Sequence, residues 1–390
     1  MRGEMANPRY ICHFHTPIRM PDTDAKKKQQ YPERDYTAGG ILGSKDYRGS
    51  TGNEEIDGMV SELVESWRVG ENQALIEEMI ITALNIGHDN MGVAELKLLN
   101  RNLKELRKAD NVFRPYSHRR KVTVYGSART KPGEPEFEAA KTFSKTMQEH
   151  GCMVITGAGH GIMGAANEGA GRRDSFGLNI ALPFEQSANE TVLGDHKLIT
   201  FNYFFTRKLT FVKEADGVAL FPGGFGTMDE GFELLTLMQT GKAKILPIVM
   251  VDAPGGTYWK TFVQFLEEHL LRLELISEED FSLFKVTDDL DEAVDELLTF
   301  YRNFHSYRWV GDQLIFRLLH PLTKNAVAKL GHEFDDILQE PGFKLRPALP
   351  EECDEPTLER LPRLVCTPHH HRYGRHRELI DAINLAACES

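Results

Sequence analysis

Three glycine-rich loops each follow a short apolar run and precede a segment with helical spacing. They are Gly126-Ser127-Ala128-Arg129, Gly157 to Gly164, and Pro222 to Thr227. In open parallel sheets ligands bind outside the carboxyl ends of the strands, so these loops are the first candidates for a binding site. In the third loop, the two consecutive glycines and the following Gly226-Thr227 let backbone N–H groups and a helix dipole converge on an anion. We predict a monophosphate site there.

The glycine loops also match other nucleotide motifs in part. No Gly-Lys-Ser/Thr is present, so ATP hydrolysis of the Walker A kind is disfavoured. Gly159-x-Gly161-x-x-Gly164, with Glu185 about twenty residues on, formally matches the dinucleotide fingerprint. It follows the second strand of the unit rather than the first, and its glycines serve a tight turn equally well. An NAD-dependent oxidoreductase and a purely structural turn therefore both stay open.

The third loop carries a resemblance to a known family. Pro222-Gly223-Gly224-Phe225-Gly226-Thr227-Met228-Asp229-Glu230 resembles the PGGxGTxxE signature of the LOG (Lonely Guy) phosphoribohydrolases, long mislabelled as lysine decarboxylases. Between about Lys121 and about Tyr301, Gly126-Ser127 resembles the family's first phosphate-side loop, Gly157 to Gly164 its GGGxxGLMG segment, and Arg207-Lys208 its paired basic residues. Family members release the free base from nucleoside 5′-monophosphates, including cytokinin riboside monophosphates, and leave ribose 5-phosphate.

The resemblance implies a site and a substrate. It implies a hydrolase that acts on a nucleoside 5′-monophosphate with Arg207 and Glu230 as catalytic residues, without a cofactor or metal. The residues it implies for binding phosphate and substrate are Gly126, Ser127, Arg129, Gly157, Gly159, Gly161, Lys208, Gly223, Gly224, Gly226 and Thr227. Ala158 departs from the family pattern, and the long flanks are similar to the extended class of the family and to larger bacterial nucleotide nucleosidases.

Glu230 has two interpretations. We expect it in the first turn of a helix that starts at Thr227, where the dipole favours the ionised carboxylate and makes it a poor general acid. It would then contact ribose hydroxyls and stabilise positive charge that grows on the sugar. Alternatively, Thr227-x-x-Glu230 is a capping box, in which the carboxylate satisfies only the backbone N–H of Thr227. We expect Asp229 at the periphery and Glu233 on the helix surface.

Arg207 lies in a predicted amphipathic helix, NYFFTRKLTFVKEAD. Because a guanidinium stays charged near neutral pH, it pairs with anions rather than transferring protons. The alternative for Arg207 and Lys208 is a solvated helix end. No lysine is singled out for a Schiff base, so pyridoxal-dependent decarboxylation is disfavoured. A non-catalytic nucleotide or cofactor carrier of Rossmann type remains an alternative of a different class.

The elements that position these residues follow from periodicity. Six short runs (KVTVYGS, CMVIT, GLNIAL, KLITF, DGVALF and ILPIVMV) alternate with helical segments, which predicts an α/β domain with a doubly wound, Rossmann-like parallel sheet over residues 119–301. Apolar i, i+3, i+4 spacing predicts a helical N-terminal extension over residues 56–118. Residues 1–55 read as a poorly structured arm. Residues 302–390 form a mixed C-terminal extension, in which Tyr307 to Leu319 is expected to be helical.

Composition limits the possible binding partners and the location of the protein. The 390 residues carry a formal charge of −12, which opposes nucleic-acid binding. No run is long and apolar enough for a membrane and no signal peptide is evident, so we expect a cytoplasmic protein. Apolar residues in both flanks, Trp67, Phe304, Trp309 and Phe316, lead us to expect a homodimer or higher homo-oligomer. His369-His370-His371 cannot all face one ion, so a surface patch or subunit contact is favoured over a metal site.

Overall fold

The computed structural model describes residues 49–68, 70–182, 187–369 and 371–389. Its larger sheet contains seven parallel strands in the order β4-β3-β2-β1-β5-β6-β7. They are β1 (Lys121–Tyr125), β2 (Met153–Thr156), β3 (Ser175–Ile180), β4 (Leu198–Phe201), β5 (Gly217–Leu220), β6 (Ile248–Val251) and β7 (Lys285–Thr287). The predicted parallel α/β sheet is confirmed. The six predicted strands are present, and the short edge strand β7 was missed.

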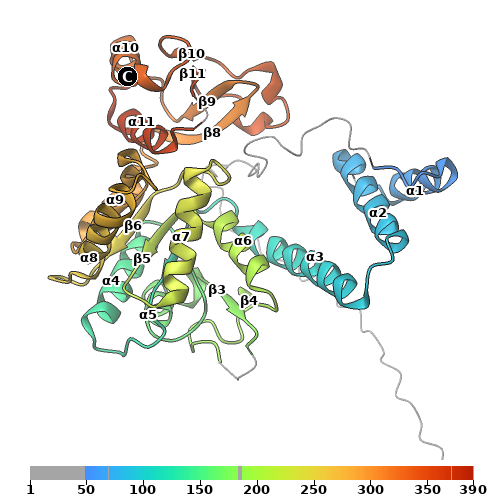
Figure 1. Cartoon of the computed structure of the whole chain (residues 1–390), viewed down its shortest axis with the longest axis horizontal. Helices are drawn as coiled ribbons and strands as arrows, with labels where there is room; N and C mark the ends of the chain where they lie inside the picture. Colours follow the sequence, from blue (N-terminus) through green and yellow to red (C-terminus); the bar gives the residue numbers. More distant parts are fainter. Residues whose placement is uncertain (1–48, 69, 183–186, 370, 390) are drawn as a thin grey trace, which may run out of the picture.

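Helices cover both faces of this sheet (Figure 1). On one face lie α4 (Pro135–Glu149), α5 (Ile162–Ala170) and α9 (Leu290–Thr299), whose apolar side chains share one core cluster. On the other lie α6 (Phe204–Glu214), α7 (Phe225–Gln239) and α8 (Tyr258–Phe265). Strands buried from both sides need mostly apolar side chains, which explains the apolar character of these runs.

The strand order reverses direction at the centre of the sheet. β1 pairs with β2 on one side and with β5 on the other, and the chain runs outward from each. The loops after β1 and β5 therefore leave the same edge at the topological switch point, where open α/β sheets bind ligands. Those loops are Gly126 to Arg129 and Pro222 to Thr227.

Three helices precede the sheet: α1 (Glu54–Trp67), α2 (Gln73–His88) and α3 (Val93–Phe113). They agree with the predicted helical extension, although α1 begins at Glu54, inside the predicted arm, and most of that arm lies outside the described residues. The Asn53 side chain accepts hydrogen bonds from the first amides of α1. α1 packs on α2, and α3 reaches the main core through Ala109 and Phe113.

The C-terminal region corrects one prediction. Tyr307 to Leu319, expected to be helical, forms a β-hairpin of β8 (Phe304–Val310) and β9 (Gln313–Leu318). Gly311 at the turn has φ 58°, a conformation that glycine adopts without strain. β8 and β9 belong to a four-stranded antiparallel sheet, β10-β11-β9-β8, with β10 (Lys344–Arg346) and β11 (Arg363–Cys366). The accompanying helices are α10 (Lys324–Glu333) and α11 (Tyr373–Leu385).

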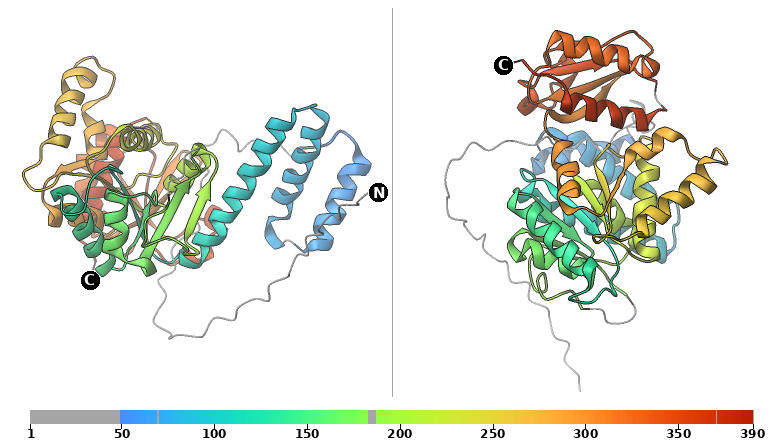
Figure 2. Two further views of the ribbon diagram at one scale, coloured as in Figure 1. Left: turned by 90° about the horizontal axis from the view of Figure 1, so that it is seen from below. Right: turned by 90° about the vertical axis from the view of Figure 1, so that its left-hand side faces the viewer.

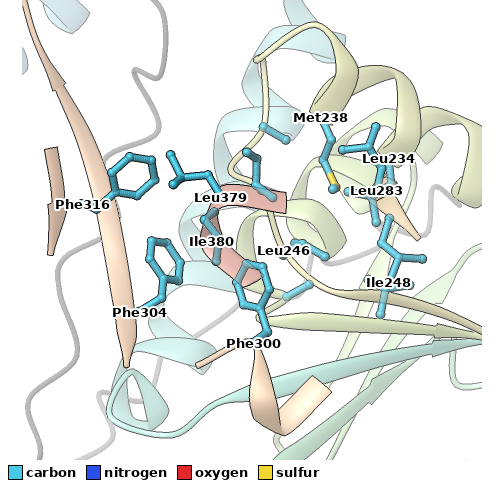
Figure 3. Packing of buried hydrophobic residues seen from close by; sticks show 14 of the residues in the cluster. Leu234, Met238, Leu246, Ile248, Leu283, Phe300, Phe304, Phe316, Leu379 and Ile380 are labelled. Atoms are coloured by element: carbon cyan, nitrogen blue, oxygen red, sulfur yellow. The ribbon is translucent and has the colours of Figure 1, made fainter. Parts of the chain in front are cut away.

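The two sheets share one apolar core (Figure 3). Phe304 and Phe316 of the smaller sheet and Ile380 of α11 belong to the same cluster as Ile248 of β6 and Leu246, which precedes it. The C-terminal extension is therefore packed against the α/β domain through continuous side-chain contact. None of the described helices has the length and apolarity that crossing a bilayer requires.

Short helical turns complete the chain. The 3₁₀ turns are Gly70–Asn72, Arg114–Tyr116, Arg172–Asp174, Glu278–Leu283, Asp335–Ile337, Pro350–Glu352 and Pro356–Leu358. One π-helical segment, Leu266–Leu271, extends α8.

Candidate active site

The three glycine loops meet at Ser127. Its backbone N–H donates to the carbonyl oxygen of Pro222 at 3.0 Å, and its carbonyl oxygen accepts from the N–H of Ile162 at 2.9 Å. The Ser127 hydroxyl accepts from the amide of Arg129 at 3.1 Å, and the Arg129 side chain is exposed. The loops that follow β1, β2 and β5 are thus hydrogen-bonded to one another at one edge of the sheet.

Glycine permits this close approach. A Cβ added to Gly161, which has φ +66°, would lie 2.2 Å from the Ser127 carbonyl oxygen. A Cβ on Gly223 would lie 2.1 Å from Thr227 Oγ1 and 3.1 Å from the Ser127 nitrogen, and one on Gly126 would lie 2.5 Å from Ile162 Cγ2. Gly126, Gly161 and Gly223 are therefore needed where the loops touch, whatever else they do.

Gly224 and Gly226 differ from those three glycines, because nothing lies within 4 Å of a Cβ built on either. α7 begins at Phe225, with Gly224 as N-cap, rather than at Thr227 as predicted. The first amides of a helix have no intrahelical acceptor, so the start of α7 presents N–H groups beside open space. The Thr227 amide already donates to Gly224, and the Thr227 side chain is buried.

Glu230 faces inward from α7 and is 7% exposed. Its Oε1 lies 3.3 Å from Arg207 Nη2, and its Oε2 lies 3.6 Å from Lys208 Nζ. Because α7 starts at Phe225, Glu230 falls in the second helical turn, and Gly224 caps the helix without a side-chain hydrogen bond. The capping-box alternative is therefore wrong: the carboxylate is paired with Arg207 and Lys208 of α6.

The electrostatics of Glu230 also correct a prediction. We expected the helix dipole to favour the carboxylate, but burial raises the pKa of Glu230 above its ordinary 4.5, while Lys208 and Arg207 act in the opposite direction. Burial penalises the ionised form because the interior solvates charge less well than water does. The same acidic group adds to burial in raising the pKa of the Tyr125 phenol at the end of β1.

Lys208 is held by three carboxylates of α7. Its Nζ lies 2.9 Å from Asp229 Oδ2 and 2.9 Å from Glu233 Oε2, in addition to its contact with Glu230. Burial alone would lower the Lys208 pKa, but these acidic neighbours leave it raised. Asp229 and Glu233, which we placed at the periphery and on the helix surface, are therefore ion-pair partners of Lys208. The i, i+3 spacing of Glu230 and Glu233 could have indicated that Glu233 shares this face, whereas the position of Asp229 beside Glu230 gives no such signal.

Arg207 connects the ion pairs to the second glycine loop. A Cβ on Gly157 would lie 4.0 Å from Arg207 Nη1, and the guanidinium lies 5.0 Å from the centroid of the Phe204 ring. Arg207 Nε is buried without a hydrogen-bond partner among the described residues. Arg207, Lys208, Glu230 and Gly157 are thus brought together as the sequence predicts, whereas Gly159 and Gly161 are buried within their loop.

Sequence reasoning missed the side chains that hold the second loop. Asn189 Nδ2 donates to the carbonyl oxygens of Ala158 and Gly159 at 3.1 Å and 3.0 Å, and also to Asn167 Oδ1. The Thr156 hydroxyl donates to the same Asn167 oxygen and accepts from the Ala158 amide. Ala158 itself has φ 62°, so this network keeps a non-glycine residue in the left-handed region.

Aromatic side chains border the open loop. The Phe225 ring is 97% exposed at the first position of α7, and the Tyr258 hydroxyl donates to the Gly223 carbonyl oxygen at 2.6 Å. Phe204, beside Arg207, is also exposed. No spacing pattern connects these three residues in the sequence, since they come from α6, α7 and α8.

Two other predicted features lie apart from this site. Glu185, the acidic residue of the dinucleotide fingerprint, lies outside the described residues, as does His370. The His369 and His371 rings are 6.0 Å apart between centroids. In the parts of the chain that the structure describes, no group of three or more His, Cys, Asp or Glu is placed to hold a metal ion.

Comparison with known proteins gives one family match. Residues 163–297 match a family model described as "Possible lysine decarboxylase". The matched region contains Arg207, Lys208 and Glu230, but it spans only about a third of the chain. No curated protein matches the sequence significantly.

Solved structures match part of the chain at low identity. A molybdenum cofactor binding protein from Rippkaea orientalis is 15% identical, with a TM-score of 0.33, and the match covers 45% of this chain and 94% of that one. The molybdenum cofactor carrier protein from Chlamydomonas reinhardtii is 18% identical, with coverage of 46% and 98% and a TM-score of 0.32. DNA processing protein A from Helicobacter pylori is 13% identical, with coverage of 46% and 80% and a TM-score of 0.31.

Proposed function

We propose that the protein hydrolyses the N-glycosidic bond of nucleoside 5′-monophosphates, AMP or cytokinin riboside monophosphates among them, to free base and ribose 5-phosphate. The observation that carries the proposal is the buried Glu230, paired with Arg207 and Lys208 directly behind an open glycine loop at the switch point of the sheet. The matched family region includes all three residues, and the PGGxGTxxE resemblance includes Glu230.

The phosphate binds at the start of α7 in this proposal. Helix-terminal amides and the positive end of the helix dipole favour a phosphate dianion there, and Gly224 and Gly226 leave room for it. The phosphate is remote from the bond that breaks, so its binding energy orients the sugar. Exposed Phe225, Phe204 and Tyr258 offer ring surfaces to the base.

Glu230 and Arg207 act at the sugar. The bond between C1′ and the base nitrogen breaks, the electron pair leaves with the base, and positive charge develops on the ribose ring. The Glu230 carboxylate stabilises that charge, and its raised pKa makes it a better acceptor for a proton of the attacking water. The water oxygen bonds to C1′, and the proton that the water gives up to Glu230 balances the proton that the departing base takes up. Arg207 keeps the Glu230 carboxylate in position through their ion pair and cannot itself transfer a proton.

The test compares AMP with adenosine, with free adenine measured by chromatography. We expect turnover of AMP and little turnover of adenosine, because adenosine lacks the phosphate that the α7 amides hold. Equal turnover of both would contradict the phosphate anchor. A panel of GMP, IMP, CMP, UMP and cytokinin riboside monophosphates then defines the base.

The carrier alternative gives a different result in the same experiment. A carrier binds AMP, measurable by calorimetry, and releases no adenine over hours. An oxidoreductase would instead change the fluorescence of added reduced nicotinamide nucleotide. Adenine release at a rate proportional to enzyme, without a nicotinamide signal, favours the hydrolase over both.

A further inference from the structure

The N-terminal helices expose an unusual share of apolar surface. Among the described residues, twelve of the twenty-four exposed large apolar side chains fall between Ile56 and Leu103. They are Ile56, Met59, Leu63, Trp67, Leu75, Met79, Leu84, Met91, Val93, Leu96, Leu99 and Leu103. Trp67 alone is 80% exposed. Such a concentration of exposed apolar side chains indicates a surface that another protein covers.

α3 has three distinct faces. Glu105, Ala109 and Phe113 are buried against the body. Leu96, Leu99 and Leu103, at i, i+3, i+7 spacing, form an exposed apolar stripe. Between these two faces runs a basic stripe of exposed side chains, Lys97, Arg101, Lys104, Arg107 and Lys108. The solvent side of α3 is therefore an apolar line with positive charge beside it.

α1 carries the matching pattern with the opposite charge. Val60 and Val64 pack on α2, and Ile56, Met59, Leu63 and Trp67 form an exposed stripe beside them. Glu55 and Glu62 flank that stripe, and α1 contains five acidic residues and no basic one: Glu54, Glu55, Asp57, Glu62 and Glu65. Glu55 and Glu62 are seven residues apart, the same spacing as Lys97 and Lys104 on α3.

The two helices do not meet within one chain. In both Figure 1 and the left view of Figure 2, α2 lies between α1 and α3, and the α1–α2 pair projects from the body. The acidic stripe of α1 and the basic stripe of α3 are therefore available to a second molecule. A second copy supplies a basic stripe for α1 and an acidic stripe for α3 at the same time, because a two-fold axis pairs each α1 with the partner's α3.

We propose that the chain self-associates through α1 and α3, with the acidic, apolar face of α1 from one copy docked on the basic, apolar face of α3 from the other. Burial of the apolar stripes supplies the affinity. The Glu and Lys stripes set orientation and register, because exposed ion pairs contribute little affinity but disfavour a mismatched pairing.

Paired charge reversals test the arrangement on the full chain. One variant carries Lys97→Glu and Lys104→Glu, and the other carries Glu55→Lys and Glu62→Lys. We expect each variant alone to lose the wild-type association by at least tenfold, measured by light scattering at micromolar concentration. Mixed in equal amounts, the two variants have opposite charges at both contacts and should regain the wild-type mass, with native mass spectrometry showing one copy of each.

Two further variants separate the contact from general effects. Leu99→Glu with Leu103→Glu should also abolish association, whereas Lys324→Glu with Lys329→Glu, exposed on α10, should leave the mass unchanged. Circular dichroism confirms that each variant is folded. A monomeric wild type, a wild-type mass in the Lys97→Glu, Lys104→Glu variant, or a mixture that stays apart would each overturn the proposal. These readouts require no turnover, so they are independent of the proposed hydrolysis.

Discussion

The surroundings of Glu230 decide what its carboxylate can do. An exposed glutamate in a first helical turn would be a weak base held ionised by the dipole. Glu230 instead lies one turn deeper, where burial raises its pKa and Arg207 and Lys208 partly offset that effect. A carboxylate with a raised pKa accepts a proton more readily, yet the adjacent cations keep the charged form accessible. This combination suits a group that stabilises cationic charge and activates water.

We therefore predict that Glu230→Gln lowers kcat for AMP by at least about 10²-fold, the size of effect expected when a transition-state interaction is lost. The substitution keeps the shape of the side chain and removes its charge. Adenine release under saturating AMP measures it. Glu149→Gln, an exposed glutamate on α4, serves as the control and should keep the wild-type rate. A near-normal rate in Glu230→Gln would remove the carboxylate from the chemistry.

At the scale of elements, the contact between the first and second loops depends on glycine at two positions, Gly126 and Gly161. Gly161 has φ +66°, and a Cβ there would meet the Ser127 carbonyl oxygen at 2.2 Å, so Gly161→Ala must displace one of the two loops. Gly133 also has a positive φ of +87°, but nothing lies within 4 Å of its Cβ position. Comparing the two variants separates steric overlap from backbone strain.

We expect Gly161→Ala to reduce the free energy of unfolding by about 1–3 kcal/mol more than Gly133→Ala does, the usual cost of overpacking. Urea denaturation of both variants measures the difference. Gly161→Ala should also raise KM for AMP, because the displaced loop borders the proposed phosphate site. Equal losses of unfolding free energy in the two variants would show that the loops move apart without an energetic penalty.

The elements differ in how far sequence could predict them. β1, β2, β3, β5 and β6 are predictable because strands buried on both faces need mostly apolar side chains, and β4 is predictable from its apolar residues although Thr200 is exposed. α1 to α3 are predictable from their helical spacing. β7 has three residues, two of them only partly buried, and gives too short a pattern. In Tyr307 to Leu319 the apolar residues suited a helix as well, and the turn at Gly311 was the signal that decided otherwise.

The site shows the same limit. The glycine loops were predictable because they follow strands, and Arg207, Lys208 and Glu230 were proposed from the family resemblance. The contact of Asn189 with Ala158 joins residues far apart in the chain, without a shared pattern. The pKa of Glu230 depends on how α6 packs against α7, which periodicity does not reveal.

At the scale of the whole molecule, buried charge lies in the C-terminal sheet. Arg317 and Arg363 both donate to the Glu352 carboxylate, and all three side chains are buried. Removing one member of such a group leaves an uncompensated buried charge. We therefore expect these three residues to favour this packing of the sheet strongly over alternatives that separate them. His305 on β8 lies near these arginines and near Arg120, which immediately precedes β1 of the larger sheet.

The region where the two sheets join should therefore be sensitive to acid. Burial, with the positive charge of Arg120, Arg317 and Arg363, lowers the pKa of His305 from 6.5 to about 4. Because the unfolded chain binds this proton more readily than the folded one, stability falls as pH decreases from 6.5 towards 4.

We predict that wild type loses about 2 kcal/mol more free energy of unfolding than His305→Gln does between pH 7 and pH 5, measured by urea denaturation at each pH. His332→Gln, an exposed histidine on α10, should show the same pH dependence as wild type. If wild type and His305→Gln lose the same free energy of unfolding, protonation of His305 does not destabilise the folded protein. The contact between the two sheets would then accommodate a further positive charge.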